Sequence, residues 1–178
     1  MTSPDDRRLR EGLRRGDESV LAELLQEYWA PVVRFVRTIL GDTDIAEDVA
    51  QETFVRLWTA RERWRGEGAL APLLYRIARN AALDERKGRR RIGPIDAEPH
   101  VAIPTYEHPD AALETRDLER AIRRAVDALP PKRREIFLLA RATDLTYAQI
   151  AEALGVSPQT VANQMSRALK DLREALPK

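Results

Sequence analysis

Two short helices separated by a glycine carry the side chains whose types and spacing suit a definite chemistry. Residues 146–170, TYAQIAEALGVSPQTVANQMSRALK, are expected to form a helix, a tight turn and a second helix. The candidates for ligand contact begin and line the second helix: Ser157, Pro158, Gln159, Thr160, Asn163, Gln164, Arg167 and Lys170. Amides can bond adenine edges in pairs, and cationic groups can reach guanine or phosphate. The segment predicts a DNA-contacting helix-turn-helix, and the alternative is an ordinary helical hairpin with a solvated polar face.

Local sequence signals place the ends of these two helices. Thr146 with Gln149 fits a capping box, and Gly155 allows the positive φ that ends the first helix. Ser157 is expected to cap the second helix, with Pro158 at its first position, where a missing N–H is harmless. Apolar residues at helical spacing should form the shared core: Ile150, Leu154, Val156, Val161, Met165 and Leu169.

A second feature with possible chemistry is a basic run in the first half of the chain. Residues 72–91 carry seven basic and two acidic side chains, although the 178-residue chain has a net charge of only +1. Such a run is often a solvated helix face, but it also suits a phosphate backbone. With 43% hydrophobic and 33% charged residues, the composition is that of a globular protein rich in helix formers.

Several classes of function are excluded by residues that the sequence lacks. It has no cysteine, which rules out disulfides, thiolate zinc sites and cysteine nucleophiles. Its two histidines, His100 and His108, are eight positions apart in a proline-containing stretch and make poor metal ligands. We find no nucleophile set or phosphate-binding glycine loop, and we expect a non-enzyme without metal or cofactor. With no apolar stretch of about 20 residues or signal core, the chain is expected to be cytoplasmic, without membrane insertion.

The expected architecture is all-α, with two small helical domains joined by a flexible linker. The first domain covers residues 1–91, the acidic linker with four prolines covers 92–110, and the second domain covers 111–178. In the first domain, Pro31 is expected to kink or break a helix and Gly41 to end it. Asp44 and Glu47 form another candidate capping box. Helices of the second domain are predicted near 111–128, 131–143, 146–154 and 158–175.

Three segments, taken together, resemble the bacterial sigma-70 family, in its extracytoplasmic function (ECF) branch. They are AEDVAQETFVRLW at 46–58, LLYRIARNAALDERKGRRR at 73–91, and the stretch from ALPPKRREIF to KDLREAL at 128–176. The resemblance covers nearly the whole chain apart from the linker. It implies a protein that is not an enzyme, that binds RNA polymerase core and that directs it to promoters through two helical domains.

The resemblance also assigns roles to particular residues. The helix with Asp48, Gln51, Glu52 and Arg56 is expected to dock on the largest polymerase subunit. The loop from Trp64 to Pro72 and the helix after it should recognise and open the minus-ten element. The residues implied there are Trp64, Arg65, Arg76, Arg79, Asn80, Arg86, Lys87, Arg89 and Arg90. The linker would pass through the polymerase, and residues 158–170 would recognise the minus-thirty-five element.

Two positions depart from the family pattern. Leu73 stands where many members have Trp, and Ala162, Asn163 and Gln164 stand where the family often has Lys-Ser-Arg. The upstream element is therefore expected to differ from that of relatives. Many relatives are held inactive by an anti-sigma factor, and the resemblance extends that expectation to this chain. A competing hypothesis is a free-standing regulator that binds duplex DNA as a dimer, although it leaves the basic residues 76–91 without a role.

Overall fold

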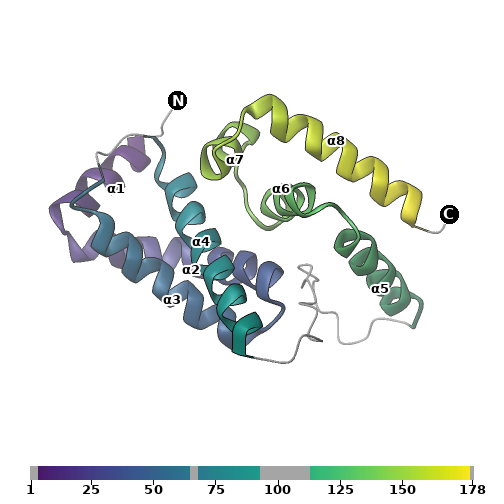
Figure 1. Cartoon of the computed structure of the whole chain (residues 1–178). Coiled ribbons are helices and arrows are strands. Elements are labelled where there is room, and N and C mark those ends of the chain that lie inside the picture. Colours follow the sequence, from purple (N-terminus) through teal and green to yellow (C-terminus); the bar gives the residue numbers. More distant parts are fainter. Residues whose placement is uncertain (1–3, 65–67, 93–112, 177–178) are drawn as a thin grey trace.

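The described part of the chain is helical throughout. The structure, a computed structural model, describes residues 4–64, 68–92 and 113–176, and it has no strand within those ranges. The first four helices are α1 (Pro4–Arg15), α2 (Glu18–Leu40), α3 (Thr43–Ala60) and α4 (Leu70–Ile92). The last four are α5 (Leu113–Asp127), α6 (Pro131–Ala142), α7 (Tyr147–Leu154) and α8 (Pro158–Ala175). Figure 1 shows them as two groups, which confirms the all-α prediction with two helical domains.

The core of the first domain lies between α2, α3 and α4, which pack on one another. Leu24, Val32 and Phe35 on α2 are almost completely buried. The Phe35 ring meets the buried Tyr75 ring of α4 edge to face, with 5.6 Å between ring centroids. A break or a kink was expected at Pro31, and the break does not occur, because α2 continues through Pro31 from Glu18 to Leu40. Burial of the apolar residues on both sides of Pro31 outweighs the missing N–H.

The start of α3 corrects one predicted cap. Asp42, and not Asp44, is the N-cap residue: its carboxylate accepts from the Ile45 N–H at 3.2 Å. Asp44 lies within the first turn of the helix, where a carboxylate is favoured by the helix dipole. Gly41 ends α2 as predicted, with φ 79°, and its N–H donates to the Arg37 carbonyl.

The second domain is built on the contacts of α8 with α5, α6 and α7. Ile150, Val161 and Met165 are buried between these helices, as the apolar spacing predicts. Leu169 was predicted to join them and does not, because 49% of its surface is exposed. Ala168 and Leu172 supply the buried face in that part of α8, so the apolar stripe is shifted by one position.

The two domains pack against each other. In Figure 1, α6 and α7 lie on the side of the second domain that faces the first, and their main contacts there are with α2 and α4. The predicted linker, residues 92–110, lies outside the described residues except for Ile92, which is the last residue of α4. The two histidines of that segment are therefore not described either. None of the helices in the described ranges is long and apolar enough to cross a membrane.

Candidate nucleic-acid interface

The turn between α7 and α8 has the geometry that the sequence predicts. Thr146 caps α7: its hydroxyl accepts from the Gln149 N–H at 3.3 Å, and the Gln149 side chain accepts from the Thr146 N–H at 2.9 Å. Gly155 ends α7 in the left-handed region, with φ 65° and ψ 39°. The next N–H, on Val156, donates to the Ala151 carbonyl at 3.0 Å. These hydrogen bonds satisfy backbone N–H and carbonyl groups that have no partner at the ends of a helix. They also fix the angle between α7 and α8.

The start of α8 is equally well defined. Ser157 is its N-cap and accepts from the Thr160 N–H at 3.0 Å, and Pro158 occupies the first helical position. Because Val161 and Met165 are buried against the rest of the domain, the opposite face of α8 points outward. The predicted contact residues on that face are accessible. Ser157, Pro158, Gln159, Asn163, Arg167 and Lys170 are exposed, and Thr160 and Gln164 are partly exposed.

Two hydrogen bonds orient amide side chains on this face. Gln159 Nε2 donates to Asn163 Oδ1 at 3.0 Å, and Arg133 Nε of α6 donates to Gln164 Oε1 at 3.2 Å. Arg133 is also bonded to Asp171. The bond from Arg133 engages the carbonyl oxygen of Gln164, so its NH₂ group is the part left to donate to a base acceptor. Sequence reasoning missed Arg133, because it lies 31 positions from Gln164 and no local pattern connects them.

The basic side chains of α4 do not form one continuous surface. Arg76 lines a pocket beside the loop before α4, whereas Arg79 and Arg86 line a cavity of about 420 Å³ that faces α6. Asn80, Lys87 and Arg89 are exposed to solvent. Arg65 lies outside the described residues, and the side chain of Arg90 is not described.

One of these cations is held by the second domain. Arg79 forms a two-point ion pair with Glu135 of α6: Nη2 donates to Oε2 at 3.0 Å, and Nε donates to Oε1. Both side chains are largely buried, with 28% and 20% of their surfaces exposed. Paired, planar contacts of this kind are the strongest that an arginine makes with a carboxylate. A residue assigned to DNA is therefore engaged within the protein.

The loop pocket, with a volume of about 410 Å³, lies at the start of α4. Its lining residues come from three places in the sequence: Arg63, Trp64, Gly68, Pro72, Leu73, Arg76 and Glu152. Trp64 is partly exposed there. Glu152, from α7, comes so near Gly68 that a Cβ on this glycine would lie 2.0 Å from its Oε1. The pocket combines an indole, two guanidinium groups and a carboxylate from the other domain.

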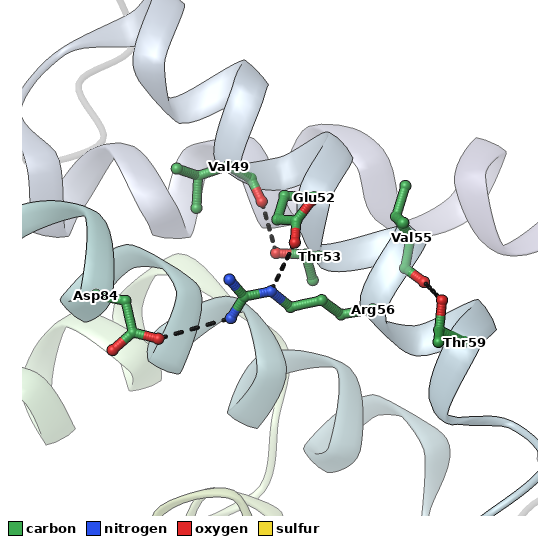
Figure 2. A network of polar contacts seen from close by, with 7 residues as sticks. All are labelled: Val49, Glu52, Thr53, Val55, Arg56, Thr59 and Asp84. Carbon is green, nitrogen blue, oxygen red and sulfur yellow. Dashed lines mark hydrogen bonds and ion pairs between the residues drawn. The ribbon is translucent and has the colours of Figure 1, made fainter. Parts of the chain in front are cut away.

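The third set of candidates forms a ridge on α3. Asp48, Gln51, Glu52 and Arg56 are all exposed, as a docking surface requires. Figure 2 shows Arg56 between two carboxylates: its Nε lies 2.8 Å from Glu52 Oε1, and its Nη1 lies 3.6 Å from Asp84 Oδ2 of α4. The hydrogen bond that Arg56 donates to Glu52, with the negative charges of Glu52 and Asp84, raises the pKa of Arg56 and keeps it cationic.

An apolar side chain also belongs to this ridge. Val55 is 53% exposed and lies one turn from Gln51 and Glu52, so the three share a helix face. The inner face of α3 is closed by a different bond, in which the buried Thr53 hydroxyl donates to the Val49 carbonyl at 2.7 Å (Figure 2). Sequence reasoning missed Val55, because exposure of a single valine cannot be told from its type.

Comparison with known protein families matches both domains. Residues 24–92 match the model described as Sigma-70 region 2, and residues 119–172 match the model described as Sigma-70, region 4. The RNA polymerase sigma-H factor of Pseudomonas aeruginosa is 29% identical over 185 residues, which cover 99% of this chain and 96% of that protein. The ECF RNA polymerase sigma factor SigE of Mycolicibacterium smegmatis is 30% identical, over 92% of this chain and 65% of that protein.

Solved structures show the same fold. CnrH, in complex with the cytosolic domain of CnrY, superposes with a TM-score of 0.70 at 20% identity, over 95% of each chain. The sigma factor RpoE of Bartonella quintana, in complex with the anti-sigma factor NepR, gives a TM-score of 0.63 at 23% identity, over 86% of this chain and 96% of that one. The two family matches and the shared fold thus define a promoter-recognition factor of two helical domains. The chain belongs to the sigma-70 family, in its extracytoplasmic function branch.

Proposed function

We propose that this chain binds RNA polymerase core through the α3 ridge and directs it to promoters, where α8 recognises the minus-thirty-five element and α4 with the loop pocket opens the minus-ten element. The corresponding division is residues 1–91 for core binding and minus-ten recognition, 92–110 for the linker, and 111–178 for minus-thirty-five recognition. The observation that carries the proposal is the outward face of α8, where amides and cations stand on a capped helix-turn-helix.

The chemistry of that face supports base recognition. Two amides, on Asn163 and Gln164, lie within one turn of each other, and Arg167 and Lys170 follow on the exposed side of α8. Amides suit adenine edges, whereas cations suit guanine or phosphate. The hydrogen bond from Arg133 fixes the orientation of the Gln164 amide before DNA binds. This supports the assignment of Gln164 to a base rather than to a phosphate. A free-standing dimeric regulator is not favoured, since region 2 and region 4 both match within one chain.

A balance of energies supports the need for polymerase. Opening about ten base-pair steps, at about 1.4 kcal/mol each, costs roughly 14 kcal/mol. Each base stacked on an aromatic ring returns about 1–3 kcal/mol. Only Trp64, among the aromatic residues described here, lines the loop pocket, so a few captured bases cannot supply the difference. A large partner that bends and holds the DNA is required, and the net charge of +1 agrees with weak DNA binding by the chain alone.

The remaining assignments follow from this role. As a sigma factor the chain would have no catalytic activity of its own, and it would act in the cytoplasm with promoter DNA and polymerase. We also propose that an anti-sigma factor controls it, in analogy with the pairing of RpoE and NepR, whose sigma subunit has the same fold. Co-purification of the tagged chain from its own host would identify that partner.

Binding to core polymerase tests the assignment of the ridge. Wild-type chain should co-elute with core in size-exclusion chromatography, and Asp48→Ala should weaken this association about tenfold, as loss of a well-placed interface charge does. Glu11→Ala is the matched control, because Glu11 is an exposed carboxylate on α1, away from the ridge. Failure of the wild-type chain to bind core would overturn the proposed function. Equal losses in both variants would remove the ridge from the interface.

A further inference from the structure

Two side chains of α1 hold the segment that leads into α4, although they lie 64 and 58 positions earlier in the chain. The Leu70 N–H donates to Asp6 Oδ1 at 2.9 Å, and Arg10 Nη1 donates to the Gly68 carbonyl at 2.7 Å. The two side chains also bind each other, with 3.1 Å between Arg10 Nε and Asp6 Oδ2. Only 15% of Arg10 and 20% of Asp6 is exposed, so solvent weakens these contacts little.

These bonds replace a local helix cap. The first N–H groups of a helix have no partner within it, and the residue just before the helix usually accepts from one of them. Gly68 and Ala69, which precede α4, have no side-chain oxygen to do so. Asp6 supplies the acceptor from α1 instead. Gly68 has φ 76°, in the left-handed region that residues other than glycine rarely adopt. The hydrogen bond from Arg10 to the Gly68 carbonyl holds the chain in this conformation and so fixes its direction into α4.

The fixed segment forms one side of the loop pocket. Trp64 and Arg63 lie before it, and Leu73 and Arg76 lie after it on α4. A shift of Gly68 relative to Leu70 would change the distance between the indole and the guanidinium groups. The size of the pocket, and the base that fits into it, therefore depend on contacts made by α1.

We propose that Asp6 and Arg10 are positioning residues for minus-ten recognition, which act by holding Gly68 and Leu70 so that the loop pocket keeps one shape. The inference rests on the proposed function. It extends that function to α1, which lies ahead of residues 24–92 matched to region 2. Asp6 and Arg10 do not touch the DNA base in this account; they determine which base the pocket prefers.

The test compares promoter variants that differ only at the captured minus-ten base, transcribed by core with the full-length chain. Asp6→Ala should reduce discrimination between these templates about tenfold, which is less than the roughly hundredfold loss that misplacement of a reacting group by about 1 Å can cause. Asp6→Asn keeps an oxygen acceptor and should retain most of the discrimination. Glu11→Ala is the matched control, because it removes an exposed carboxylate from the same helix, α1.

The outcomes separate this inference from the proposed function. If wild-type chain with core gives no transcript, the proposed function fails. If wild-type chain transcribes and Asp6→Ala discriminates as well as wild type, only the inference fails. Equal loss of transcription on every template, or the same effect from Glu11→Ala, would show that α1 contributes stability alone and would overturn the positioning role.

Discussion

The turn of the helix-turn-helix can be tested with one pair of substitutions that make the same chemical change at two glycines. Gly155 ends α7 with φ 65°, and a Cβ there would have no atom within 4 Å. Gly88 lies within α4, and a Cβ there would also meet nothing within 4 Å. Crowding is therefore absent at both glycines, and only the backbone conformation distinguishes them. We expect Gly155→Ala to destabilise the protein and Gly88→Ala to stabilise it.

The magnitudes follow from the backbone alone. An L-residue in the left-handed region costs about 1–2 kcal/mol. Alanine also restricts the unfolded chain, which returns about 0.4–1 kcal/mol of that cost. The free energy of unfolding should therefore fall by about 1 kcal/mol in Gly155→Ala, which lowers the melting temperature of a domain of this size by about 4–8 °C. In Gly88→Ala it should rise by about 0.5–1 kcal/mol, because glycine is unfavourable inside a helix.

The three tryptophans allow the two domains to be followed separately. Trp29, Trp58 and Trp64 all lie in the first domain, so their fluorescence reports its unfolding, whereas circular dichroism reports both domains. Thermal melts should show the loss in Gly155→Ala by circular dichroism and the gain in Gly88→Ala by both probes. If the two domains unfold together, the variants are still distinguished, because the melting temperature should fall in Gly155→Ala and rise in Gly88→Ala. A stability of Gly155→Ala equal to that of wild type would mean that the left-handed turn does not exist in solution.

Three further predictions concern the two interfaces and a partly buried phenol. Changing Lys87 and Arg89, both exposed on α4, to Ala should impair transcription from duplex more than from a pre-opened template; equal impairment would indicate phosphate anchoring without melting. In promoter selection from a randomised library, Gln164→Ala should alter preference at one base pair, whereas Lys170→Ala should weaken all sites alike, and the reverse pattern would contradict the orientation of α8. Burial, with a smaller contribution from Glu27, raises the pKa of Tyr28 to about 12 from 10.0. Because the unfolded chain releases this proton first, stability should fall between about pH 10 and 12, and Tyr28→Phe should reduce this fall in the urea-unfolding profile. The remaining fall should come from Tyr75, whose pKa is also raised by burial.

The parts of the site that local sequence determines could be predicted. The Thr146–Gln149 capping box, the left-handed Gly155 and the Ser157 cap all depend on residues within a few positions of one another. The all-α fold follows in the same way from apolar residues at helical spacing. Errors of one turn or less, such as Asp44 in place of Asp42, arise because two neighbouring residues can both act as caps.

The parts that depend on contacts between distant residues could not be predicted. Nothing near Leu70 indicates that Asp6 accepts its N–H, and nothing near Gln164 indicates that Arg133 orients it. The prediction that Leu169 is buried was wrong, because the position of a helix in its bundle decides which edge of an apolar stripe reaches solvent. Such features follow from the packing of helices, to which a single sequence without aligned relatives gives no direct access.

Run-off transcription with purified core polymerase, on a library of genomic fragments, is the most direct measurement of the central claim. The account predicts discrete transcripts when core and this chain are combined, and none of these transcripts when either is present alone. It also predicts that their promoters share two separated sequence elements, one for each domain. The same start sites with and without the chain would contradict the claim that these two helical domains select promoters for the polymerase.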